Sequence, residues 1–138
     1  MTTLFEYDAL WEYQPTSAEI PADPASLVVP ATDWLGPEPA PFGEVGADLV
    51  DYPAATLWGL GTGIWLRRGI EVDVSADIII SGIVDNQCYL YFDGQFIGAF
   101  NPSGAARGDF LPWSIVIPAS LATPGTHPLA LLCQDELP

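Results

Sequence analysis

The feature that most constrains this chain is a two-residue alternation that begins at residue 64. Residues 64–74 alternate between two faces. One face is apolar and carries Ile64, Leu66, Ile70, Val72 and Val74, and the other carries Trp65, Arg67, Glu71 and Asp73. Successive side chains of a β-strand point to opposite faces, so this pattern predicts a half-buried strand. No segment shows a convincing 3.6-residue helical period.

Further strand signals follow at short intervals. Residues 77–84, which include three consecutive isoleucines, read as a strand buried on both faces, and residues 110–117 and 129–133 read as two more. Asp93-Gly94 lies between the apolar runs 88–92 and 95–100, and this dipeptide favours the tight turn of a β-hairpin. Several short strands with frequent turns predict an all-β fold, a two-sheet antiparallel β-sandwich or jelly roll.

The front of the chain is rich in proline. Residues 15–53 hold eight of the 14 prolines, which disfavours long helices and supplies few ladder donors. The stretch also carries Trp34, Leu35, Phe42 and Tyr52, which water solvates poorly. We therefore expect one domain, in which residues 1–60 form an acidic, loop-dominated arm with entry strands, and residues 61–138 form the sandwich core. Removing residues 1–45 should leave a soluble sandwich and abolish assembly.

Charge excludes one class of partner. The chain has 18 acidic residues and three basic ones, which gives a formal net charge of −15. Such a surface repels phosphate backbones, so we expect no nucleic-acid binding. The apolar runs are too short to span a bilayer, and the first residues lack the pattern of a signal peptide, so membrane insertion is not expected either. The acidity fits simple solubility, a docking surface for a basic partner, or weak cation binding.

The sequence offers little for catalysis. His127 is the only histidine, and no serine lies in a nucleophile-elbow context. Cys88 and Cys133 have no metal-ligand spacing, and each lies in an apolar run, which predicts two reduced core thiols. A disulfide would need them on neighbouring strands and an oxidising compartment. We expect no enzyme activity and no cofactor.

Arg68 is the sharpest local prediction. Alternation places it between Leu66 and Ile70 on the apolar face, where a guanidinium needs a carboxylate partner. Asp85, after the next predicted strand, is the expected partner in a buried structural pair. The alternative is that Gly69 marks a bulge that turns Arg68 into solvent.

The five tryptophans admit two interpretations. Those in or beside loops and interfaces could stack on sugar rings, with Trp34 and Trp58 the better candidates and Trp65 and Trp113 the others. The alternative is that all five pack in the core or under the arm, because large aromatics dominate burial in small β domains.

Motifs over residues 64–135 carry a family resemblance. The runs IWLRRGIEV, IIISGIVDNQCYLYFDGQFIGAFN and SLATPGTHPLALLCQD, with PAPFGE and then Thr56 and Trp58 upstream, resemble the galactose-binding-like jelly roll. That domain occurs in family 2 glycoside hydrolases and in carbohydrate-binding modules. Here Asp85-Asn86 replaces the commoner Asp-Asp pair, and His127 stands where Asn is frequent. Some relatives hold a structural calcium, which the resemblance would place at Asp135 and Glu136 or at Asp85, although these form no recognisable calcium loop.

These observations favour a non-catalytic structural or interaction protein of a large assembly. The most concrete version is a bacteriophage virion component of the tail, fibre or capsid-decoration kind, located in the virion. Its partners would be copies of itself and other virion proteins, with a host glycan as a further ligand. The alternatives are a carbohydrate-binding module that uses loop aromatics, and an accessory domain of an enzyme.

Overall fold

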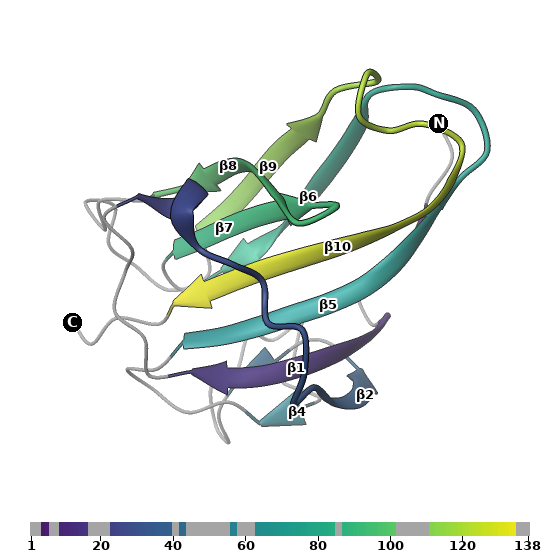
Figure 1. Ribbon diagram of the computed structural model, residues 1–138. Coiled ribbons are helices and arrows are strands. Elements are labelled where there is room, and N and C mark those ends of the chain that lie inside the picture. The colour runs from purple at the N-terminus through teal and green to yellow at the C-terminus, as the bar shows by residue number, and fades with distance from the viewer. Residues whose placement is uncertain are drawn as a thin grey trace.

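Two long antiparallel strands, β5 (Gly63–Val72) and β10 (Gly125–Gln134), run side by side through the centre of the fold (Figure 1). Their register is continuous from the Gly125–Val72 pair to the Gln134–Gly63 pair. The computed structural model describes residues 4–5, 9–16, 23–39, 42–43, 56–57, 63–84, 87–101 and 111–134. Within these ranges every regular element is a strand, apart from the 3₁₀ turn η1 (Pro24–Ser26).

The main sheet has six strands in the order β2-β1-β5-β10-β7-β8, and all its pairs are antiparallel. Its other members are β1 (Leu10–Thr16), β2 (Leu35–Pro39), β7 (Gln87–Phe92) and β8 (Gln95–Phe100). A second antiparallel sheet pairs β6 (Ile78–Val84) with β9 (Leu111–Ile117). The short strands β3 (Phe42–Gly43) and β4 (Thr56–Leu57) pair in parallel. The all-β, two-sheet prediction is confirmed.

The β7–β8 turn follows directly from its two residues. Asp93 and Gly94 have φ angles of 53° and 78°, so both lie in the left-handed region. A two-residue turn with positive φ at both central positions matches the twist of the flanking strands. Glycine adopts this conformation without strain and aspartate tolerates it better than most residues. The predicted hairpin therefore forms where Asp-Gly placed it.

The main core lies between the two sheets. Alternate side chains of β5, β10 and β7 point inward and meet those of β6 and β9. The fully buried members include Ile64, Cys88, Leu90, Ile117 and Leu129. Gly82 on β6 makes room for the indole of Trp113, because a Cβ at Gly82 would lie 3.2 Å from that ring. The core thus depends on one small residue opposite one large one.

A second apolar cluster covers the other face of the main sheet. It consists of Trp65, Tyr89, Tyr91, Ala130 and Leu132, all buried. Residues 23–34, which we call the strap, cross this face, as the dark blue segment in front of β10 and β5 shows (Figure 1). The strap packs Leu27, Val29 and Trp34 against the cluster. This part of the predicted arm is therefore an ordered cover on its own sandwich.

The sandwich core is not confined to residues 61–138, where the sequence placed it. β1 is an interior strand of the main sheet, between β2 and β5, and Trp11 is buried in the main core. Pro15 argued against a strand here, because proline has no N–H to donate to a β-ladder. The structure tolerates Pro15 because β2 pairs with β1 only as far as Tyr13. Beyond that residue, β1 is paired with β5 alone. Residues 1–45 therefore contain part of the sandwich, and their removal should not leave it intact.

Two burial predictions also need correction. The strand expected at residues 77–84 forms as β6, from Ile78, but it is not buried on both faces: Ile78 and Ile80 point inward, while Ile79 is 56% exposed. Val74 does not continue the apolar face of β5, because the strand ends at Val72 and Val74 is 78% exposed in the following turn. Apolar sequence alone did not reveal which face has a cover.

Candidate functional site

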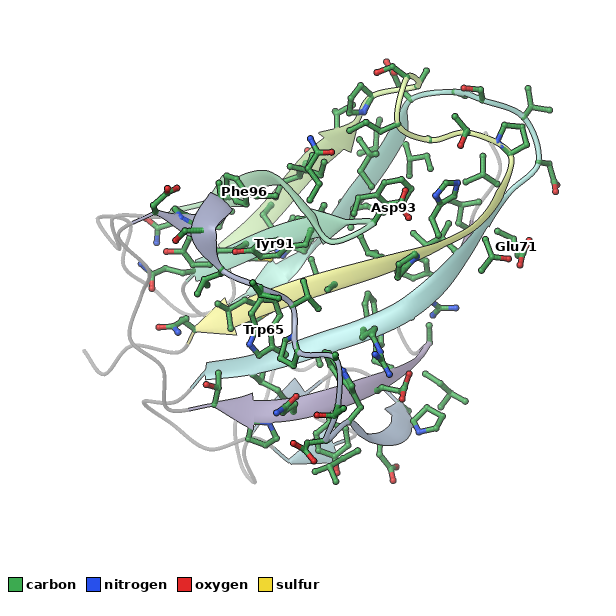
Figure 2. All side chains as sticks on the ribbon, viewed as in Figure 1. Trp65, Glu71, Tyr91, Asp93 and Phe96 are labelled. Atoms are coloured by element: carbon green, nitrogen blue, oxygen red, sulfur yellow. The ribbon has the colours of Figure 1, made fainter. Side chains whose placement is uncertain are left out.

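The strap is held on the sheet by an aromatic row. Trp65, Tyr91 and Phe96 lie next to one another beneath it (Figure 2), with ring centroids 5.4 Å apart for Trp65–Tyr91 and 5.6 Å for Tyr91–Phe96. The Tyr91 hydroxyl donates a hydrogen bond of 2.8 Å to the Pro24 carbonyl. Burial, with smaller contributions from Tyr89 and Asp23, raises the pKa of Tyr91 to about 12. Tyr91 therefore stays a neutral donor at physiological pH.

A charged cluster anchors the far end of the strap. Arg67 forms a bidentate ion pair with Glu12, at 3.0 and 3.1 Å from Nη2 to the two carboxylate oxygens. The Arg67 guanidinium also lies over the Trp34 ring, 4.3 Å from its centroid. The Trp34 indole N–H donates to the Pro30 carbonyl at 2.8 Å. These contacts join β1, β5 and the strap at one point.

The four tryptophans considered for sugar stacking have different positions. Trp65 and Trp113 are only 6% and 8% exposed, so their rings belong to the two apolar clusters and offer almost no surface to a ligand. Trp34 is half-buried and already carries Arg67 on its ring. Trp58 lies outside the described residues. The structure therefore does not gather Trp34, Trp65 and Trp113 into one platform.

Arg68 does point to the apolar face of the main sheet, as alternation predicted. Its guanidinium lies over the rings of Phe5 and Trp11, at 4.5 and 5.6 Å from their centroids. The register of β5 and β10 passes through Gly69 without a shift, so the bulge alternative does not hold. Burial lowers the pKa of Arg68. Its predicted partner Asp85 lies outside the described residues, so the pair stays a prediction.

Sequence reasoning missed the best-organised polar cluster, at the end of the molecule where the β7–β8 hairpin meets the β9–β10 turn. His127 Nδ1 lies 2.8 Å from Asp93 Oδ2, and Nε2 lies 2.6 Å from the Thr123 carbonyl. The imidazole stacks on Phe92, with 4.9 Å between centroids and 25° between planes. Nearby, the Thr126 hydroxyl donates to Glu71; Figure 2 shows Asp93 and Glu71 at this end. The only usable signal was a single histidine in a turn of a very acidic chain.

This cluster does not provide the parts of a hydrolase. An Asp–His pair can orient a general base, but the second ring nitrogen must then face a nucleophile or a water. Here Nε2 is bonded to a backbone carbonyl. The described residues contain no group of three or more His, Cys, Asp or Glu side chains that could hold a metal ion. The calcium candidates Asp85, Asp135 and Glu136 lie outside the described part of the chain.

Cys88 and Cys133 are both free and buried, as the sequence predicted for core thiols. They lie directly opposite each other on β7 and β10. Burial, and then the neighbouring Cys133, raises the pKa of Cys88 well above its usual range. The Cys88 thiol is therefore protonated and unreactive in the folded protein.

The exposed apolar side chains define a different kind of surface. Ile79 and Val116 are opposite each other in the β6–β9 register, on the outward face, and are 56% and 49% exposed. Ser81 and Ser114 form the pair two residues along, so these outward positions carry no charge. We call Ile79, Ser81, Ser114 and Val116 the outer patch.

No helix of the described chain is long and apolar enough to cross a membrane.

Comparison with known proteins supports the fold alone. No protein-family model matches the sequence, and no curated protein matches it closely. Among solved structures, the chain is similar to a β-glucuronidase of Faecalibacterium prausnitzii, with 21% identity, a TM-score of 0.57, and coverage of 94% of this chain and 20% of that one.

Two further β-glucuronidases give the same result. For the enzyme of Dictyoglomus thermophilum the identity is 17%, the TM-score 0.56, and coverage 95% of this chain and 19% of that one. For the enzyme of Ruminococcus gnavus the identity is 19%, the TM-score 0.55, and coverage 93% of this chain and 20% of that one. The chain thus spans about a fifth of the length of these enzymes. It has the fold of a β-sandwich domain of family 2 β-glucuronidases, in agreement with the resemblance seen in the sequence.

Proposed function

We propose that this chain is a non-catalytic structural and interaction domain, which associates with copies of itself and with partner proteins in a larger assembly. The outer patch carries this proposal. Ile79 and Val116 form an exposed, in-register apolar pair on a strand face with no charged position among its four described members. Exposed apolar surface on a sheet is a common feature of interaction sites.

The charge of the chain supports the choice of this face for self-association. Two copies with a formal net charge of −15 each repel one another at most orientations. The repulsion is smallest where the surfaces that meet carry little charge, and the four residues of the outer patch carry none. Asp77, two residues before Ile79, is the nearest acid along β6, and its carboxylate accepts a hydrogen bond from the Ala119 N–H at 2.8 Å. Two apolar side chains per copy form a small contact, so we expect a weak, concentration-dependent dimer rather than an obligate one.

A bacteriophage virion is the assembly that we propose for this domain. The proposal rests on the sequence features given above, namely the strong acidity, the proline-rich segment and the scarcity of catalytic motifs in the sequence. Copies held side by side in a virion would meet at high local concentration, where a weak contact suffices. Labelled antibody against the protein should then decorate purified virions. If the protein is absent from virions, the virion proposal is excluded, and the proposed self-association is then judged by the experiment below.

The test of the domain's role is self-association by analytical ultracentrifugation. The double substitution Ile79→Thr with Val116→Thr keeps β-branched side chains and makes the outer patch more polar, and should weaken the dimer at least tenfold. Val74→Thr is the matched control, because Val74 is 78% exposed in the β5–β6 turn and is not one of the four patch residues. Equal weakening by both would show that the patch is not the contact.

Glycan binding remains the second candidate, favoured by the likeness to a domain of carbohydrate-active enzymes and by the half-buried ring of Trp34. A monomer that binds glycans, and loses them on Trp34→Ala, would support this candidate over assembly.

A further inference from the structure

The His127 cluster joins two separate turns through one imidazole ring. Asp93 belongs to the tip of the β7–β8 hairpin, and Thr123 to the β9–β10 turn. The side chain of His127 is 11% exposed and is fixed from one side by the stacked ring of Phe92. The ring therefore cannot reorient without breaking packing.

Both neighbours of the ring nitrogens are hydrogen-bond acceptors. A carboxylate oxygen of Asp93 faces Nδ1 at 2.8 Å, and a backbone carbonyl oxygen faces Nε2 at 2.6 Å. A neutral imidazole carries one N–H, so it can donate to only one of them. The imidazolium carries two and satisfies both. The geometry thus requires the charged form.

The charges around the ring favour the same state. Asp93 approaches from the hairpin and Glu71 from β5, and Asp77 binds the β9–β10 turn by accepting from the Ala119 N–H at 2.8 Å. The described residues of that turn, 118–124, contribute no charged side chain. The bond to Thr123, then the bond to Asp93, raises the pKa of His127.

We propose that His127 is a pH-dependent latch, which in its imidazolium form ties the tip of the β7–β8 hairpin to the β9–β10 turn. When the ring loses its proton, one nitrogen presents a lone pair to an oxygen lone pair, and that contact opens. Because the folded pKa lies above the unfolded value of about 6.5, the stabilisation is complete below that value. It is lost as pH rises through the folded pKa.

A single histidine makes the test direct. Nitrogen-15 NMR of the imidazole reports whether one or both ring nitrogens carry a proton, and a titration gives the midpoint. We expect both nitrogens to be protonated at pH 7 and the midpoint to lie above 6.5. A neutral tautomer at pH 7, or a midpoint at or below 6.5, would overturn the latch.

Two variants separate the latch from general acidity. Asp93→Asn should lower the midpoint, because the amide cannot stabilise the charge as a carboxylate does. Asp73→Asn removes one charge from the β5–β6 turn, where the structure shows no contact with the ring, and should shift the midpoint much less. Amide exchange of Asp93 and Leu121, whose N–H groups donate to the Pro128 and Pro118 carbonyls, should accelerate above the midpoint in the wild type after correction for its intrinsic pH dependence. If these rates show no step in the wild type, the ring does not control the two turns.

Discussion

Trp11→Ala tests whether the N-terminal segment belongs to the folded core. Trp11 is only 5% exposed, packs edge-on against Phe5 at 5.5 Å between centroids, and lies beneath the Arg68 guanidinium. A buried indole removes roughly 200 Å² from water, which at about 25 cal/mol per Å² gives an upper estimate of about 5 kcal/mol. Measured costs of such truncations are about 3–5 kcal/mol. We expect a loss of about 4 kcal/mol in the free energy of unfolding.

The assay is urea unfolding followed by the fluorescence of the remaining tryptophans. With a slope of about 2 kcal/mol per molar urea, the expected loss moves the midpoint down by about 2 M. Leu35→Ala on the adjacent strand β2 is the control: Leu35 is 49% exposed, and its truncation should cost less than about 1 kcal/mol. If Trp11→Ala costs no more than this control, β1 is not part of the core. Should the variant fail to fold, Trp11→Leu gives a graded comparison.

Three further predictions concern other parts of the fold. Gly82→Ala should destabilise the fold by about 1–3 kcal/mol, because the added Cβ meets the Trp113 ring at 3.2 Å. Calorimetry should show a lowered Tm, whereas an unchanged Tm would mean that the indole can move aside. Tyr91→Phe should cost about 1 kcal/mol through the lost bond to Pro24 and should speed proteolysis within the strap, whereas unchanged cleavage would show that packing alone holds it. The Cys88 thiol should react with a disulfide reagent only as fast as the protein opens, so fast labelling of the native state would contradict its burial.

Local chemistry explains what the sequence could predict. The Asp93-Gly94 hairpin needs only two residues that accept positive φ, and the alternation in β5 needs only one buried face. Both signals are contained within ten residues of chain. The sheet position of β1 was not visible, because Pro15 reads as a strand breaker unless one knows that β2 ends before it.

The candidate sites were harder to predict because they depend on contacts between distant segments. His127 and Asp93 are 34 residues apart, and only the approach of two turns makes them partners. The tryptophans could not be sorted into core and surface without the strap, whose residues bury Trp65 from outside the sheet. Likewise, the isoleucine run in β6 gave no indication that Ile79 faces outward without a cover among the described residues.

The most direct test of the proposed role is the molar mass of the purified full chain by light scattering after gel filtration, from micromolar to near-millimolar loading. One copy has a mass of 14.8 kDa. We predict an apparent mass that rises with concentration toward twice this value, and a smaller rise for the Ile79→Thr, Val116→Thr variant than for Val74→Thr. A constant 14.8 kDa across the whole range would contradict self-association.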